Sequence, residues 1–235
     1  KMGKRVLIID ADIRKSSYIK RYQIKQKTNG LSQYLSGQVA LEEIIYSTNY
    51  RNLEIIFSGP YAPNPSELLE QGRFGGLIEE TRKVYDYILI DCPPALGLLT
   101  LNGLTAADKL IVPMLAEFYA MEGLSQLTST IKIVRNNFNP SLEIAGILFV
   151  MFDQRLNLSK QVEEEVEKFF PGKVFQTKIP RNVRLSEAPS HGKPVMYYDP
   201  SSKGAEAYAM LGMELLGETP EPKKEKKRLL FGRRK

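Results

Sequence analysis

Cysteine and histidine are almost absent from this sequence: Cys92 and His191 are the only ones among 235 residues. A single cysteine excludes an internal disulfide and is typical of proteins that stay in a reducing cytosol. Structural zinc sites take about four Cys and His ligands, so we expect none here. Any chemistry must therefore rest on carboxylates, Lys and Arg, hydroxyl groups and the backbone.

A long hydrophobic run is also missing. A membrane-spanning helix needs about 20 mostly apolar residues, and the first apolar run, Val6 to Ile9, has only four. This run is also shorter than the apolar core of a signal peptide. We therefore expect a cytoplasmic protein.

Positive charge is concentrated at one end of the chain. The net charge is +6, but residues 223–235 contain eight Lys or Arg and one Glu, so the rest of the chain is close to neutral. The stretch GETPEPKK at 217–224 marks the end of a folded domain. We predict a folded domain over 1–216 and a flexible basic tail over 217–235.

Short apolar runs alternate with helix-like segments along the chain. The predicted strands are 5–9, 53–57, 86–90, 109–112, 144–150 and 174–177. The predicted helices lie within 40–46, 66–84, 119–138 and 159–170. Apolar strands that alternate with helices are typical of a parallel sheet covered on both faces. The predicted fold is α/β, with a mostly parallel, doubly wound sheet that binds ligands beyond the carboxyl ends of its strands.

Three acidic residues follow predicted strands. Asp10 and Asp12 end the strand in RVLIIDAD, and Asp91 ends the strand in YDYILIDCPP. The second pattern has the layout of a Walker B element, in which an Asp holds the water shell of Mg²⁺ bound to a nucleotide. Asp also caps helices and turns, so each acid taken alone fits a structural role. Together they predict a magnesium–nucleotide site at one edge of the sheet.

The sequence contains no phosphate-binding loop of the form G-x-x-x-x-G-K-[ST]. Gly-Lys occurs at 3–4, 172–173 and 192–193, followed by Arg, Val and Pro. The Gly-rich RFGGL at 73–77 lacks the lysine and lies in a helical pattern. The acids of a nucleotide site are thus present without the loop that binds the phosphates.

Four segments carry a family resemblance: GKRVLIIDAD, YDYILIDCPPALGLLTLNGLTAAD, EFYAMEGLSQL and IPRNVRLSEAPSHGKPVMYYDPSSKGAEAY. They resemble the ParA/Soj group of deviant Walker A ATPases, relatives of MinD. The resemblance implies a nucleoid-associated homodimer that uses ATP and Mg²⁺, binds DNA non-specifically and is stimulated by a ParB-like protein. In that family a strand, a phosphate loop and a helix precede the first segment. The resemblance therefore implies a fold lacking these three elements, with exposed apolar surface, and a chain inactive as an ATPase.

The resemblance also assigns roles to individual residues. Asp12 would orient the attacking water, while Asp10 and Asp91 would support Mg²⁺. Pro180 and Asn182 in IPRN would contact the adenine, although Pro180 also fits as a plain strand terminator.

Two arginines match positions on which DNA binding depends in the partition family. They are Arg155 in FDQRLN and Arg184 in RNVRLSEAP. Four further basic residues would extend the patch: Lys178, Arg181, Lys193 and Lys203. Contacts from Arg to phosphate bind strongly, depend on salt and carry little sequence information. A solvated basic surface is the alternative.

Residues 12–85 resemble a second group. DADIRKSSY, GLSQYLSGQVALEEII and SGPYAPNPSELLEQGRFGGLIEE are similar to the tyrosine kinases of bacterial capsule synthesis, which share the same fold. That group has a C-terminal tyrosine cluster, whereas the last 27 residues here, from Ala209, contain no tyrosine. A regulator resembling these kinases is therefore one alternative function.

The tail offers another alternative. Leu229, Leu230 and Phe231 lie among its basic residues and resemble the membrane-targeting tail of MinD-like proteins. Basic charge and a few apolar side chains give weak, reversible contact with an anionic membrane surface. A MinD-like positioning ATPase and a merely solvated tail both fit this pattern.

Overall fold

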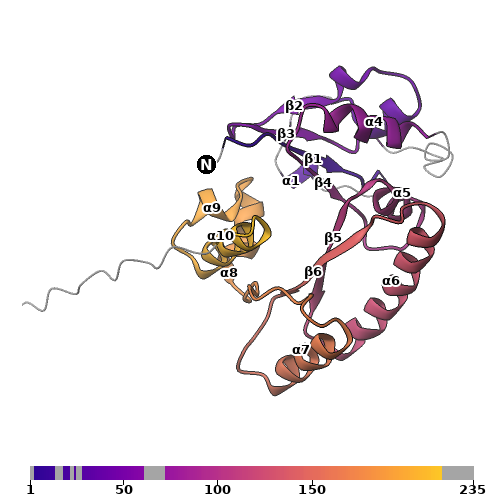
Figure 1. The fold of residues 1–235 in the computed structure, drawn as a ribbon. Helices are drawn as coiled ribbons and strands as arrows, with labels where there is room; N and C mark the ends of the chain where they lie inside the picture. Colours follow the sequence, from indigo (N-terminus) through magenta and orange to yellow (C-terminus); the bar gives the residue numbers. More distant parts are fainter. Residues whose placement is uncertain (1–2, 14–17, 22–23, 25–27, 61–71, 219–235) are drawn as a thin grey trace, which may run out of the picture.

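Strands of the described part of the chain form two sheets (Figure 1). The computed structural model describes residues 3–13, 18–21, 24, 28–60 and 72–218. The first sheet contains, in spatial order, β2 (Ile45–Ser47), β3 (Leu53–Ile56), β1 (Val6–Asp10) and β4 (Tyr87–Asp91). The second sheet contains β5 (Lys109–Leu115) and β6 (Glu143–Val150). Among these pairs only β2–β3 is antiparallel, so the predicted α/β class with mostly parallel strands is confirmed.

The helices alternate with these strands. In chain order they are α1 (Tyr18–Arg21), α2 (Leu31–Leu35), the 3₁₀ helix η1 (Leu41–Glu43), α4 (Arg73–Arg82), α5 (Leu98–Ala106), α6 (Phe118–Asn137), α7 (Asn157–Phe169), α8 (Val183–Glu187), the 3₁₀ helix η2 (Ala188–His191), α9 (Val195–Tyr198) and α10 (Lys203–Leu215). The helices predicted within 119–138 and 159–170 correspond to α6 and α7. The prediction for 66–84 is confirmed for α4, while residues 66–71 lie outside the described residues.

The helix predicted within 40–46 is wrong. Apolar residues at helical spacing form only the short turn η1, and Ile45 then begins β2. The β-branched and aromatic side chains of Ile45 and Tyr46 favour a strand. An antiparallel hairpin with β3 supplies the hydrogen bonds of that strand.

The strand predicted over 174–177 is also wrong in part. Only Val174 forms a bridge with β6. The N–H of Phe175 still donates to the carbonyl of Ile147 on β6 at 3.0 Å. The N–H groups of Gln176 and Thr177 instead donate to the carboxylate of Glu214 on α10, at 2.7 and 2.9 Å. A helix side chain thus replaces the strand partner for the second half of this segment.

One face of the first sheet is buried under α2 and α4, and Figure 1 shows α4 lying along it. Leu7 and Ile9 of β1 are fully buried and belong to one cluster with Leu35 of α2 and Leu77 of α4. Each such side chain contributes about 1.5–3 kcal/mol on burial. This packing fixes β1, which carries Asp10 at its carboxyl end.

Both faces of the second sheet are covered. Ile147 and Phe149 of β6 pack in a cluster with Val162 of α7, whereas the intervening Leu148 packs with Leu211 of α10. Figure 1 shows α6 and α7 on one side of this sheet and α8 to α10 on the other. Helices on both faces are the arrangement expected from the sequence.

Strands β4 and β5 each have an unpaired outer edge within the described residues, because β4 ends the first sheet and β5 begins the second. Tyr87 and Leu89 of β4 are 43% and 52% exposed. Strands of parallel sheets are normally buried on both faces. The apolar surface expected from the sequence is therefore present on β4.

We expect neighbouring amides of β4 to exchange with solvent at different rates. The N–H of Tyr87 donates to the carbonyl of Arg5, toward β1. Since successive N–H groups of a strand point to opposite sides, those of Ile88 and Ile90 point to the outer edge. Hydrogen exchange measured by NMR should be at least about 100-fold faster there than at Tyr87 and Leu89. Equal protection of all four amides would show that another strand pairs with this edge in solution.

The last described helix ends close to the predicted domain boundary. α10 ends at Leu215, and Gly217 has a left-handed φ of 69°, which is typical of a helix C-cap. The basic tail is almost entirely outside the described residues, so its boundary and its contact with membranes stay predictions. Among the helices that are described, none is long and apolar enough to cross a membrane.

Candidate functional site

Asp10 and Asp91 lie side by side at the carboxyl ends of β1 and β4. The parallel register pairs these two residues directly. Asp10 is only 1% exposed. Its Oδ1 accepts the N–H of Asp12 and its Oδ2 accepts the N–H of Ser58, both at 3.3 Å. These two bonds fix the orientation of the carboxylate.

Asp91 is the more accessible of the two carboxylates. Its Oδ2 accepts a hydrogen bond of 2.9 Å from the hydroxyl group of Tyr18 on α1. Asp12 is half-buried and lies between Ala11 and Ile13, which are almost fully buried. The structure thus brings Asp10 and Asp91 together, with Asp12 next along the chain.

The pair of carboxylates fits Mg²⁺. This ion prefers oxygen ligands, keeps several waters and is usually bound by one or two carboxylates together with substrate phosphates. Within the described residues no group of three or more acidic, His or Cys side chains gathers as a metal centre. Asp10 and Asp91 would therefore hold the ion through its water shell. The phosphates of a nucleotide have no matching loop in the 235 residues.

Cys92 follows Asp91 directly but does not contribute a reactive group. Burial, together with the nearby charge of Asp91, raises the pKa of the Cys92 thiol to about 11. The thiol therefore stays protonated near neutral pH, and a protonated thiol is a poor nucleophile. Its sulfur packs against Gly103 of α5, where a Cβ atom would lie 2.6 Å from it.

The loop that contains Pro180 and Asn182 lies beside the carboxyl end of β6. Phe152 forms a parallel bridge with Pro180, and the N–H of Phe152 donates to the carbonyl of Ile179 at 2.9 Å. The Oδ1 of Asn182 accepts the N–H of Arg184 and caps α8. Both predicted adenine contacts thus have structural roles, and their contact with a nucleotide stays a prediction.

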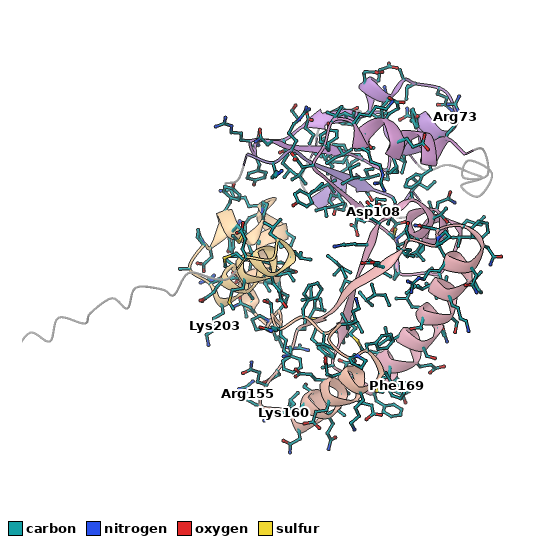
Figure 2. All side chains as sticks on the ribbon, in the orientation of Figure 1. Arg73, Asp108, Arg155, Lys160, Phe169 and Lys203 are labelled. Carbon is teal, nitrogen blue, oxygen red and sulfur yellow. The ribbon has the colours of Figure 1, made fainter. Side chains whose placement is uncertain are left out.

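Arg155 lies in the loop after β6 and Arg184 lies in α8, and their guanidinium groups differ in the number of acids that hold them. The Arg155 guanidinium is 88% exposed and contacts both oxygens of Asp153, at 2.9 and 2.7 Å. This contact lowers the pKa of Asp153 to about 2. Arg184 contacts Glu187 at 2.7 Å and Asp199 at 3.2 Å, so two acids hold it. Figure 2 shows Arg155 at the edge of the molecule, on the loop that follows β6.

A cleft of about 790 Å³ lies between α7 and residues 171–178. Charged side chains of both signs line it, including Lys178 and Glu163, whose Nζ and Oε1 atoms are 2.6 Å apart. Lys178 is mostly buried in this ion pair. It therefore does not extend the basic patch as the sequence predicted, and the cleft is separate from the carboxylate pair.

Two residues of the site were not found by sequence reasoning. Ser58 follows β3, so the rule that ligand-binding residues follow parallel strands would have identified it. Tyr18 ends the segment DADIRKSSY, whose resemblance to capsule-type kinases assigned it no role, and no strand is predicted there. Its position beside Asp91 depends on how α1 packs, which the local sequence does not specify.

Parallel strands that carry carboxylates at their carboxyl ends define an α/β protein with a candidate ligand site at that edge of the sheet. The septum site-determining protein MinD of Pyrococcus horikoshii OT3, solved in complex with Mg-ADP, matches with a TM-score of 0.74. The match covers 91% of this chain and 84% of that chain at 23% identity. Identity this low shows the fold alone.

Sequence comparisons define the family. A family model described as an AAA domain matches residues 1–144. The sporulation initiation inhibitor protein Soj of Bacillus subtilis (strain 168) is 43% identical over 223 residues, which are 91% of this chain and 87% of that protein. The chromosome partitioning protein ParA of Myxococcus xanthus (strain DK1622) is 42% identical over 233 residues, or 96% and 82% of the two chains. The chain belongs to the Soj/ParA family of chromosome-partitioning ATPases.

Proposed function

We propose that this chain belongs to a cytoplasmic, nucleoid-associated switch of DNA partitioning. In this proposal a homodimer forms in response to ATP and Mg²⁺, binds DNA without sequence preference and responds to a ParB-like partner. The 235 residues alone are inactive as an ATPase in this proposal, because they contain no phosphate-binding loop. The observation that carries the proposal is the pair Asp10 and Asp91, ordered on adjacent strands in a chain 43% identical to Soj.

Each acid has a separate task in this proposal. Asp10 and Asp91 would hold the water shell of Mg²⁺, which when bound would supply charge neutralisation at the phosphates. Asp12 orients the water that attacks the terminal phosphate. Phosphoryl transfer depends mainly on positioning and charge neutralisation, and acids anchored at the ends of buried strands supply rigid positions for both.

The adenine is assigned to the loop of Pro180 and Asn182. This loop lies at the carboxyl end of the second sheet, on the side where parallel sheets bind ligands. The Oδ1 atom of Asn182 is engaged in capping α8, so a contact with the base would use its NH₂ group.

A role in DNA partitioning is favoured over the two alternatives, a capsule-type kinase-like regulator and a MinD-like positioning ATPase. The relatives reported above are a Soj and a ParA protein, and they match over 91% and 96% of this chain. The missing tyrosine cluster argues against a capsule-type kinase. The segment that would support membrane contact, Leu229 to Phe231, lies outside the described residues.

DNA binding is assigned to the loop of Arg155 and the loop that begins α8. The guanidinium of Arg155 is well exposed, and Arg181 is near enough to Asp153 to lower the pKa of that carboxyl group further. Two basic loops therefore share one surface. Asp153 weakens the attraction of this surface for DNA, because its carboxylate accepts hydrogen bonds from the Arg155 N–H groups that a DNA phosphate would use.

We expect opposite effects from changes at Arg155 and Asp153. Arg155→Ala should weaken DNA binding about three- to tenfold and reduce the slope of log K against log salt by roughly 0.9, the value for one lost phosphate contact. Asp153→Asn should strengthen binding, because it removes a negative charge and releases Arg155. Fluorescence anisotropy with two duplexes of unrelated sequence, with and without ATP and Mg²⁺, measures both effects.

Lys132→Ala is the matched control, since it removes the same charge from an exposed position on α6. Its effect should be small and equal for both duplexes. An equal loss with Lys132→Ala and Arg155→Ala would mean that net charge, rather than this surface, determines binding. A preference for one duplex would contradict non-specific binding.

A further inference from the structure

The hydroxyl group of Tyr18 occupies one oxygen of the more accessible carboxylate of the site. The distance from Tyr18 Oη to Asp91 Oδ2 is 2.9 Å. Tyr18 belongs to α1, which lies between β1 and α2, and Asp91 ends β4. A segment 73 residues away in sequence is thus joined to the end of this strand.

This contact differs in kind from those of Asp10. The oxygens of Asp10 accept backbone N–H groups from Asp12 and Ser58, which are parts of the fold and hold a buried carboxylate in place. The donor at Asp91 is a side-chain hydroxyl on a short helix. A side chain can rotate away from its acceptor without disturbing a sheet.

Water molecules of a Mg²⁺ shell would donate to the same oxygen. Mg²⁺ keeps most of its waters in proteins, so a carboxylate beside it accepts hydrogen bonds from them or binds the ion directly. Either contact uses the lone pairs of Asp91 Oδ2 that Tyr18 now uses. The hydroxyl and the hydrated ion therefore compete for one position.

We propose that Tyr18 is a positioning residue that holds Asp91 and is displaced when Mg²⁺ binds there. When the ion displaces Tyr18, α1 loses its hydrogen bond to the end of β4. The position of α1 therefore depends on whether the metal is bound. The inference rests on the proposed role of Asp91 in supporting Mg²⁺.

Binding of Mn²⁺ alone, measured by electron paramagnetic resonance as a substitute for Mg²⁺, tests this competition without any nucleotide. Tyr18→Phe removes only the hydroxyl oxygen and should bind Mn²⁺ at least about tenfold more tightly than the unchanged chain, as expected for loss of one hydrogen bond to a charged group. Tyr119→Phe is the matched control, because Tyr119 is 82% exposed on α6. Asp91→Asn should weaken binding.

The unchanged chain provides a second measurement. With ¹³Cζ-labelled tyrosine, the Tyr18 resonance, assigned by its loss in Tyr18→Phe, should shift when Mg²⁺ is added. The shift should have the same direction as the shift that Asp91→Asn causes without metal. This measurement stays informative even where Tyr18→Phe lowers the stability of the fold.

The outcomes separate the two proposals. If Asp91→Asn weakens Mn²⁺ binding but Tyr18→Phe binds like the unchanged chain, the role of Tyr18 is wrong and the role of Asp91 stands. Weaker binding by Tyr18→Phe would overturn the competition, because the hydroxyl would then assist the ion. Binding that does not depend on Asp91 would overturn both.

Discussion

Gly30→Ala is expected to destabilise the fold by about 3 kcal/mol or more. Gly30 begins α2, and a Cβ atom there would lie 2.3 Å from the backbone nitrogen of Gly59 and 2.6 Å from the carbonyl oxygen of Phe57. Real Cβ atoms do not approach so closely, and backbone atoms cannot rotate aside as a side chain does. The segment after β3 would have to move away from α2.

That movement would reach the carboxylate site. Leu31 N–H donates to the carbonyl of Phe57 at 2.8 Å, and Ser32 N–H donates to that of Ser58 at 3.0 Å. Ser58 in turn donates its N–H to Asp10. We therefore expect Gly30→Ala to weaken Mn²⁺ binding even under conditions where the protein still folds.

Gly75→Ala and Gly76→Ala are the matched controls. Both glycines lie inside α4, and a Cβ atom added at either would meet no neighbouring atom within 4 Å. Alanine has a higher helix propensity than glycine, so each change should stabilise the protein by about 0.5–1 kcal/mol. Urea unfolding followed by circular dichroism measures all three variants. If Gly30→Ala left the stability unchanged, the segment after β3 would have to move away from α2 at little cost in free energy.

The sequence was most informative where structure is local. β1 and β4 are continuous apolar runs, and each ends in an acid. Because parallel strands place their carboxyl ends at one edge, the proximity of Asp10 and Asp91 followed from this pattern alone.

Prediction failed where tertiary contacts decide the structure. α5 was not predicted, because Leu98, Leu99, Leu101 and Leu104 lie on several sides of it and give no helical period. It forms because Leu99 and Leu104 are buried in two different clusters of the core. The separation of the strands into two sheets likewise depends on pairing between distant segments, which single-sequence patterns do not contain.

We expect the carboxylates alone to be insufficient for catalysis. In the proposed role Asp10 and Asp91 hold a hydrated ion, but negative side chains repel the phosphates of ATP. Charge on the transferred phosphoryl group must be neutralised by backbone N–H groups and a lysine as well as by Mg²⁺. In the 235 residues no Gly-Lys is followed by Ser or Thr.

We therefore expect a polypeptide of these 235 residues to show no Mg²⁺-dependent ATP turnover above background. The same polypeptide joined at its first residue to the Walker A segment of Bacillus subtilis Soj should bind ATP at least about 100-fold more tightly and hydrolyse it, since phosphate positioning and charge neutralisation supply most of the catalysis. Equilibrium binding of a fluorescent ATP analogue and release of inorganic phosphate measure the two effects separately.

Two variants of the extended protein make this experiment specific. Replacing the lysine of the added segment with alanine should abolish tight binding. Asp12→Asn should leave binding intact and reduce turnover about 100-fold or more, because in the proposed mechanism Asp12 orients only the attacking water. Turnover by the 235 residues alone that disappears with Asp12→Asn would mean that other residues of this chain bind the phosphates. In that case the basic loops at Arg155 and Arg181 would be the first positions to substitute, since they lie at the carboxyl end of the second sheet.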